Sequence, residues 1–164
     1  MKILPTFLDL VNHKDTPLEL KELVEKCKTT PQTLKWHSEG VVYNHIFIVT
    51  NKCVKTTDID MILSGFLHDL GKVECTKKHE TKPDSWPAHG HELISTKLVE
   101  KYKGWIESWN ANYENVHFIV FNHMKMHQID KMRKSKQDKL TEHPAFHKLK
   151  LFEKFDSYQE PYIF

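Results

Sequence analysis

Histidine is abundant in this chain, which has 12 His among 164 residues. Imidazole serves as an acid or base near neutral pH and as a metal ligand, so an inward-facing histidine could do chemistry. By the helical i, i+3, i+7 rule, His45 shares an apolar stripe with Val42 and Val49. Five further polar residues lie on an apolar face or at the end of an apolar segment: His68, Asp69, His91, His123 and Asp156.

These residues would be costly to bury without partners, on the order of several kcal/mol for each charged or polar group. A single inward histidine is more often a satisfied core residue, and Asp156 alone could cap a turn or pair with a lysine. Several separate segments show the same pattern, however, and a shared cation accounts for all of them. Imidazole and carboxylate ligands suit Mn, Fe, Zn, Co or Ni, and Mg when water completes the shell. The sequence therefore predicts a site for a divalent metal ion.

The elements that must position these residues are predicted to be helices. The chain has 5 Gly and 7 Pro, no glycine-rich phosphate loop, and no alternating strand pattern with Asn-Gly turns. Helical periodicity predicts six helices: one opened by Thr16-Pro17, then one over about 41–53, one from Asp58 or Asp60 to Leu70, one through Ile94 to Gly104, one around 116–120, and one around 146–155. The polar stretch 76–87 is predicted to be a loop, and the charged segment 131–139 to be solvated.

Composition limits the classes of protein. A formal net charge of +2, with Arg133 as the only arginine, is too mild to indicate nucleic-acid binding by charge alone. Cys27, Cys53 and Cys75 lack the spacing of a zinc knuckle, so we expect reduced thiols in a cytoplasmic protein. No apolar run has membrane-spanning length, and the first residues do not fit a signal peptide. We expect one domain over residues 1–164 and leave the oligomeric state open.

The order of the polar residues resembles a known pattern. His45, the pair His68-Asp69 and the distant Asp156 resemble the H…HD…D signature of the HD-domain metal-dependent phosphohydrolase superfamily. LHDLGK at 67–72 is similar to the HD(I/L)GK form of that motif. The other matching segments are WHSEGVVYNHIFIV at 36–49, similar to the HxEGxVxxH lead-in of phage and bacterial members, and HGHE at 89–92 and FNHM at 121–124, which resemble the further histidines of two-metal members. The whole also looks similar to the HD domains of bacterial tRNA nucleotidyltransferases.

The resemblance covers about residues 36–157 and leaves residues 1–35 as an N-terminal helical extension. It implies an all-α HD-domain bundle of five to seven helices. It implies one metal held by four ligands: His45, His68, Asp69 and Asp156. His91 and His123 would hold a second metal or a substrate phosphate, with Asp69 bridging two metals. His89 competes with His91 for this role, and His127 competes less strongly with His123.

The chemistry that the resemblance implies is hydrolysis by metal-activated water. Lys72 would stabilise negative charge in the transition state, although it could also be a solvated lysine after a helix. His91 or His123, when not bound to metal, could protonate the leaving group. His37 and Glu39 could contact the substrate, or only cap the helix that follows.

The expected substrate is a phosphomonoester or a (cyclic) phosphodiester of a nucleotide or an RNA end. The chain has no GYP motif after the HD pair, which disfavours a cyclic-di-GMP phosphodiesterase, and no arginine cluster for a triphosphate. Two alternatives stay open: a catalytically silent nucleotide-binding module, and an HD-type di-iron oxygenase.

Overall fold

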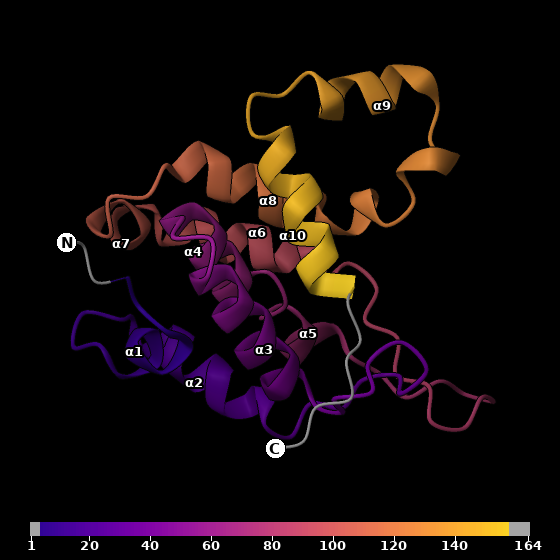
Figure 1. Cartoon of the computed structure of the whole chain (residues 1–164). Helices are drawn as coiled ribbons and strands as arrows, with labels where there is room; N and C mark the ends of the chain where they lie inside the picture. Colours follow the sequence, from indigo (N-terminus) through magenta and orange to yellow (C-terminus); the bar gives the residue numbers. More distant parts are fainter. Residues whose placement is uncertain (1–3, 158–164) are drawn as a thin grey trace.

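The computed structural model describes residues 4–157, which form α-helices, one 3₁₀-helix and loops, with no β-strand among them (Figure 1). The helices are α1 (Phe7–Asn12), α2 (Leu18–Cys27), α3 (Val42–Val54), α4 (Ile59–Leu67), α5 (Lys72–Cys75), α6 (His91–Lys101), α7 (Lys103–Ser108), α8 (Tyr113–Met126), η1 (Ile129–Lys131), α9 (Lys134–Thr141) and α10 (Phe146–Ser157). The prediction of an all-α fold is confirmed. Seven of the described α-helices have eight or more residues, and α1, α5 and α7 are shorter.

The core lies where α3, α4, α8 and α10 pack together, with α6 against α8. Helix α4 is buried along almost its whole length, and Ile62 and Phe66 are completely inaccessible to solvent. Leu149 and Phe152 of α10 are also completely buried and belong to the same core. A central helix without a polar face must be covered on all sides, which explains why the other helices surround α4.

Two glycines allow the close packing that this arrangement needs. A Cβ at Gly65 would lie 3.0 Å from the Cα of Thr50, so α4 and α3 cross with their backbones nearly in contact. A Cβ at Gly71 would lie 2.2 Å from the carbonyl oxygen of His91. Glycine at position 71 therefore lets the turn after α4 lie directly against the start of α6.

A buried carboxylate ties three helices together. Asp60, at the start of α4, accepts hydrogen bonds from the backbone N–H of Asn112 (2.7 Å) and the side chain of Asn115 (2.9 Å). Lys148 of α10 places its Nζ 2.8 Å from both Asp58 and Asp60. This network fixes α10 against α4 and α8 at the end of the bundle opposite to Asp156.

The structure departs from the predicted elements at several places. Helix α4 ends at Leu67 rather than Leu70. Gly104 does not end a helix but lies inside α7. The short helices α1, α5 and α7 were not predicted, because too few residues are available for a periodic pattern. Segment 131–139 is mostly exposed, as expected, yet it holds most of α9, which is anchored by the buried Leu140 just beyond it.

None of the helices described between residues 4 and 157 has both the length and the hydrophobicity of a membrane span.

Candidate metal centre

Four histidines from four helices, or the turns beside them, point their Nε2 atoms at one carboxylate, Asp69. Asp69 follows the end of α4 in the turn before α5, and its side chain is 3% exposed. The histidines come from positions far apart in the sequence, in the first turn of α3, at the C-cap of α4, at the first residue of α6 and in the last turn of α8: His45, His68, His91 and His123.

The first group of ligands contains two of these histidines and two carboxylates. The Nε2 atoms of His45 and His68 are 3.3 Å apart, and each lies 3.3 Å from Asp69 Oδ2. Asp156, near the end of α10, places its Oδ1 2.8 Å from His45 Nε2 and 3.2 Å from His68 Nε2. The four ligand atoms all lie within 4.8 Å of one another, which is compact enough for one metal ion.

The second group uses the other oxygen of Asp69. The Nε2 atoms of His91 and His123 are 3.2 Å apart, and they lie 3.1 Å and 3.4 Å from Asp69 Oδ1. Asp69 therefore faces the two groups with different oxygens, which is the geometry of a carboxylate that can bridge two ions. Among the described residues, His91 occupies this position, whereas His89 is exposed.

Backbone carbonyls decide which ring nitrogen is available for a metal. The Nδ1 atoms of His68, His91 and His123 lie 2.8, 2.9 and 2.6 Å from the carbonyl oxygens of Gly65, Ala88 and Val120 respectively. A carbonyl can only accept, so each Nδ1 carries the proton and each neutral ring has its lone pair on Nε2. In each case the acceptor is the carbonyl three residues earlier.

A bound metal ion explains the positions of the candidate ligands better than direct hydrogen bonds between them do. As neutral imidazoles that both use Nδ1–H as a donor, His91 and His123 cannot hydrogen-bond to each other through Nε2, yet their Nε2 atoms lie 3.2 Å apart. Nitrogen ligands at about 2.1 Å from one ion lie roughly 3 Å from each other. The donor set, imidazole with carboxylate, suits a divalent transition metal.

A comparison with protein-family models agrees with this geometry. The family model described as HD domain matches residues 42–159 of the chain, which is well over half of its length. The chain belongs to the HD-domain family. A search of curated proteins and a search of solved structures each found no match. HD-domain proteins are generally metal-dependent hydrolases, so membership supports this class of activity here, whereas the narrower likeness to tRNA nucleotidyltransferases stays a prediction.

The charges of this HD-domain site are strongly coupled in the metal-free protein. Burial would lower the pKa of His68, but the charges of Asp69 and Asp156 outweigh it and raise that pKa to about 10. Burial would raise the pKa of Asp69, but His68 and Lys72 hold it well below its usual range. Burial opposes ionisation of Asp156 too, but His68 and His127 keep its pKa well below its usual range. Both carboxylates, Asp69 and Asp156, are therefore ionised at neutral pH and ready to act as ligands.

Glu39 lies behind His45, on the side away from the candidate metal. Its Oε1 is 2.7 Å from His45 Nδ1 and 3.1 Å from His37 Nδ1. Burial opposes ionisation of Glu39, but hydrogen bonds from both histidines keep its pKa far below the ordinary value. Glu39 is not among the residues that line the pocket beside the metal centre, and a contact between Glu39 and substrate stays a prediction.

Lys72 lies inside the site rather than in solvent. Its Nζ is 3.0 Å from Asp69 Oδ2 and 2.9 Å from the Oε1 of Gln32, and its side chain is 9% exposed. Gln32 in turn donates to the carbonyl of Gly40 (3.2 Å). The sequence carried no signal for Gln32, because it stands 40 residues before Lys72 and outside the HD-domain match.

His127 extends the cluster toward solvent. Its Nε2 lies 3.1 Å from Asp156 Oδ2, and its Nδ1 lies 3.3 Å from Glu153. It therefore contacts the oxygen of Asp156 that the other histidines leave free. It orients a candidate ligand and does not compete with His123 for the second group.

A pocket of about 630 Å³ opens beside the two groups of ligands. Its floor includes Asp69, Lys72, His91 and Asp156, and His37 lies on its wall. At its mouth are Lys35, Trp36 (61% exposed) and Met124 (38% exposed). The pocket thus combines a charged floor with a partly apolar entrance.

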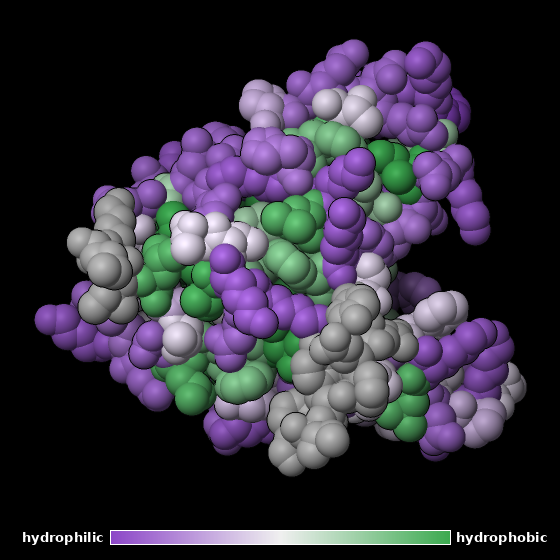
Figure 2. Space-filling model, in the orientation of Figure 1, coloured by the Kyte–Doolittle hydropathy of each residue, from purple (hydrophilic) through white to green (hydrophobic). Residues whose placement is uncertain are grey.

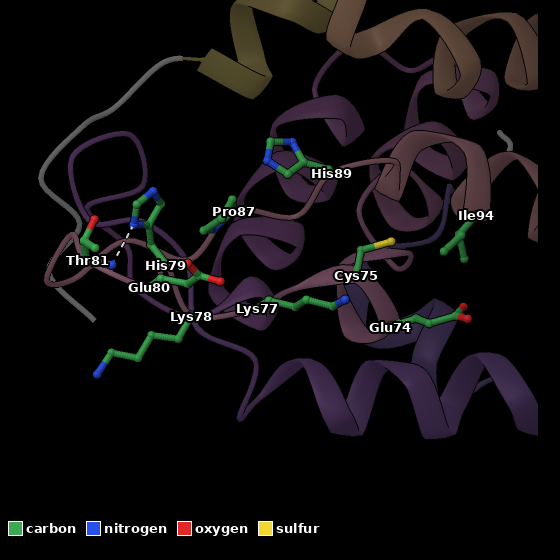
Figure 3. A pocket seen from close by; sticks show the side chains of 10 residues that line it. All are labelled: Glu74, Cys75, Lys77, Lys78, His79, Glu80, Thr81, Pro87, His89 and Ile94. Atoms are coloured by element: carbon green, nitrogen blue, oxygen red, sulfur yellow. Dashed lines mark hydrogen bonds between the residues drawn. The ribbon is translucent and has the colours of Figure 1, made fainter.

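A separate pocket of about 520 Å³, shown in Figure 3, lies along the loop that follows α5. His79 and His89 line it, with Lys77 and Glu80, and none of the six candidate metal ligands does. The backbone N–H of Thr81 donates to His79 Nδ1 there (3.1 Å), so that histidine serves the local turn.

Proposed function

We propose that this protein is a metal-dependent phosphohydrolase that cleaves a phosphomonoester or a (cyclic) phosphodiester of a nucleotide or an RNA end. The observation that supports this most directly is the shared carboxylate: Asp69 offers one oxygen to each of two histidine pairs at the floor of an open pocket. Lys72 stands beside the same carboxylate.

We assign the first ion to four ligands: His45, His68, Asp69 and Asp156. A second ion would be held by His91 and His123 together with Asp69. Divalent ions at these positions would lower the pKa of a water and polarise a phosphoryl oxygen. If one ion alone is present, His91 and His123 keep Nε2 beside Asp69 rather than on a metal, and His91, which lines the pocket, could act as a general acid: once protonated at Nε2, it would pass that proton to the leaving oxygen.

Lys72 is proposed to meet the phosphoryl group. Its ammonium is held between Asp69 and Gln32 at the floor of the pocket, so it is positioned before substrate arrives. A fixed positive charge stabilises the negative charge that builds up on phosphoryl oxygens in the transition state. His37 is proposed to contact the substrate from the wall, while Glu39 orients His45 instead of touching substrate.

The mouth of the pocket supports a nucleotide as the substrate. Trp36 and Met124 offer apolar surface, and Lys35 Nζ lies 4.8 Å from the centre of the Trp36 ring. Aromatic and thioether groups pack against a base, and lysine favours the anionic part of the molecule. Trp36 is a further candidate substrate contact, and no sequence pattern indicated it.

The test is a metal analysis of the purified protein joined to a screen of metals against substrates. The substrates are an aryl phosphate, an aryl phosphodiester, nucleoside monophosphates and 2′,3′-cyclic nucleotides. We expect one or two divalent ions per chain and hydrolysis of at least one nucleotide. Asp69→Ala and His68→Ala should lower turnover by about 100-fold or more, with helicity retained. His147→Ala, an exposed residue of α10, is the matched control and should keep normal turnover.

Three outcomes would contradict the proposal. Normal turnover by Asp69→Ala would show that the candidate metal centre takes no part in the reaction. Tight nucleotide binding without turnover of any substrate would identify a silent binding module. Two irons per chain with oxygen consumption and no hydrolysis would identify a di-iron oxygenase.

A further inference from the structure

The positive charge of this chain is concentrated in one segment, residues 125–139, which we call the basic arm. It contains six Lys and Arg residues and two Asp residues, a net charge of +4. The whole chain carries only +2, so the remaining residues carry a net charge of −2. The small net charge of the whole chain is therefore the sum of a strongly basic segment and a slightly acidic remainder. Its cations are Lys125, Lys131, Arg133, Lys134, Lys136 and Lys139.

All six cations of the basic arm are exposed. In the described part of the chain, they form one ion pair, between Lys134 and Asp138 at 3.9 Å, in which the lysine side chain is 89% exposed. Such a pair contributes little. The charges of the arm are therefore not neutralised by the protein and are available to an anionic partner.

The basic arm is folded and held in place. The side chain of Gln137 donates to the carbonyls of Ile129 (2.8 Å) and Met132 (2.9 Å), which closes η1 against α9. Ile129 and Met132 pack against the core, and Leu140 is 5% exposed. Figures 1 and 2 show α9 at the top of the molecule, with a mainly hydrophilic surface. A preformed surface binds with less loss of conformational entropy than a disordered tail.

Aromatic side chains lie among these lysines. A cavity of about 560 Å³ between α8 and α9 is lined by Phe118 and Phe121 together with Lys125, Lys136 and Lys139. Lys125 Nζ lies 4.3 Å from the centre of the Phe121 ring. Lysines that follow a backbone and an aromatic ring that stacks on a base are the combination that binds single-stranded nucleic acid. Phe121 is the ring for this role, because Phe118 is 8% exposed and already stacked on His143.

The basic arm begins at the metal centre. Helix α8 carries His123 and ends just before His127, which contacts Asp156. The next residue, Gln128, lines the aromatic cavity of the arm and also a second cavity that includes Lys72 and His91. One continuous surface therefore leads from the arm to the candidate catalytic residues.

We propose that the basic arm binds the sugar-phosphate backbone of a single-stranded polynucleotide and leads its phosphorylated end to the metal centre. The second half of this statement rests on the proposed function. A free mononucleotide has too few phosphates to engage cations spread over 15 residues, whereas a strand presents one phosphate per nucleotide. The substrate is then the end of a strand, of RNA or of DNA.

The test compares two variants that lose the same charge. The arm variant is Lys131→Gln/Arg133→Gln/Lys134→Gln/Lys136→Gln. The control variant is Lys14→Gln/Lys26→Gln/Lys55→Gln/Lys97→Gln, four exposed lysines outside the arm. The probes are fluorescein-labelled single-stranded 12-mers of RNA and DNA, measured by anisotropy over a range of salt concentrations, with metal and with EDTA. Circular dichroism checks that both variants are folded.

We expect the arm variant to bind at least one 12-mer about 10-fold more weakly or worse, while the control variant stays within about twofold of the parent protein. A plot of log K against log salt concentration has a negative slope, and each phosphate contact contributes about 0.7 to its magnitude. The slope of the arm variant should therefore be shallower by roughly 2 to 3. Hydrolysis of a terminal phosphate on the 12-mer should fall by a similar factor, and hydrolysis of a nucleoside monophosphate should not change.

Equal loss of affinity in both variants, or no binding of either 12-mer by the parent protein, would overturn the proposal. Arm-dependent binding to vesicles of phosphatidylserine without binding to the 12-mers would overturn it in favour of a membrane surface. Binding is measured apart from catalysis, so the two proposals can fail separately. If the protein hydrolyses a substrate but its binding to the 12-mers does not depend on the arm, only the proposed role of the basic arm is wrong. If the arm binds a 12-mer but no substrate is hydrolysed, only the proposed phosphohydrolase activity is wrong.

Discussion

Asp69 is the residue on which both groups of candidate ligands depend. It stands in a turn between α4 and α5, so its side chain is not confined to one helix face. Its Oδ2 lies near His45 and His68, and its Oδ1 lies near His91 and His123. Loss of this one side chain would therefore disturb both groups, whereas loss of any single histidine would disturb one.

Glu39 should tune the affinity for metal without binding it. Its carboxylate accepts from His45 Nδ1, which keeps Nε2 directed at the site. We expect Glu39→Gln to weaken metal binding by about 10-fold to 100-fold, as outer-shell substitutions do. The measurement is a metal titration by calorimetry, with the exposed Glu25→Gln as control. An unchanged affinity would show that Glu39 does not orient His45.

Metal binding should release a proton. In the metal-free protein the pKa of His68 is about 10, so its ring is protonated at pH 7.5. A ligating imidazole must be neutral, and its proton leaves when the ion binds. Affinity should therefore rise by at least roughly tenfold per pH unit between pH 7 and 9 and level off near pH 10.

Calorimetry in two buffers of different ionisation enthalpy measures this release. We expect at least about one proton per chain at pH 7.5, because Asp156 and Glu39 outweigh burial and raise the pKa of His45 as well. A matching titration of His68→Ala should release less. A metal affinity that falls as pH rises would contradict the release of a proton from His68 on metal binding.

At the scale of the elements, the candidate ligands cluster at helix ends. His68 caps α4, His91 opens α6, and His123 lies in the last turn of α8. In each case Nδ1 meets the carbonyl three residues earlier. Carbonyls in the last turn of a helix have no partner within the helix, so that of Gly65 in α4 can accept from a side chain. The carbonyl of Val120 lies inside α8 and uses its second lone pair for His123.

Gly71 should be needed to keep two of these helix ends together. A Cβ there would lie 2.2 Å from the carbonyl oxygen of His91. We expect Gly71→Ala to destabilise the protein by roughly 1–3 kcal/mol through overpacking, and to weaken binding at the second group of ligands. Urea unfolding and metal titration measure the two effects.

Gly104→Ala is the matched control, because a Cβ at Gly104 meets nothing within 4 Å and the residue lies in α7. It should leave metal binding unchanged and raise stability by about 0.5–1 kcal/mol, the usual gain from alanine in a helix. Equal effects of the two substitutions would argue against close packing at Gly71.

At the scale of the whole molecule, the candidate metal centre joins helices from both ends of the chain. His45 of α3 and Asp156 of α10 are 111 residues apart in sequence, and their side chains lie 2.8 Å apart. An ion held there would bind the folded chain and not the unfolded one. Such selective binding stabilises the fold in proportion to the logarithm of the free metal concentration.

A bound ion should therefore raise the melting temperature. At a free metal concentration of about 100 Kd the gain is about 2.7 kcal/mol, which corresponds to roughly 5–10 °C for a chain of this size. Thermal denaturation with the bound metal and with EDTA measures it. Asp69→Ala should show no such shift, and an equal shift in that variant would place the metal elsewhere.

Much of this protein could be predicted from local sequence. The all-α fold and the main helices follow from apolar residues at helical spacing, because that spacing determines which face of a helix is buried. The same periodicity placed His45, His123 and Asp156 on inward faces. Short or polar helices such as α1 and α9 carry no such pattern, since their stability comes from contacts with other parts of the chain.

Tertiary structure alone decided how the inward residues meet. Periodicity gives the direction of a side chain around its own helix, but the distance between His45 and Asp156 depends on how α3, α4 and α10 cross. That crossing depends on contacts between distant residues, such as Gly65 against Thr50. The roles of Gln32 and Glu39, and the path from the basic arm to Lys72, are likewise properties of packing, because the residues involved are brought together only when the chain folds.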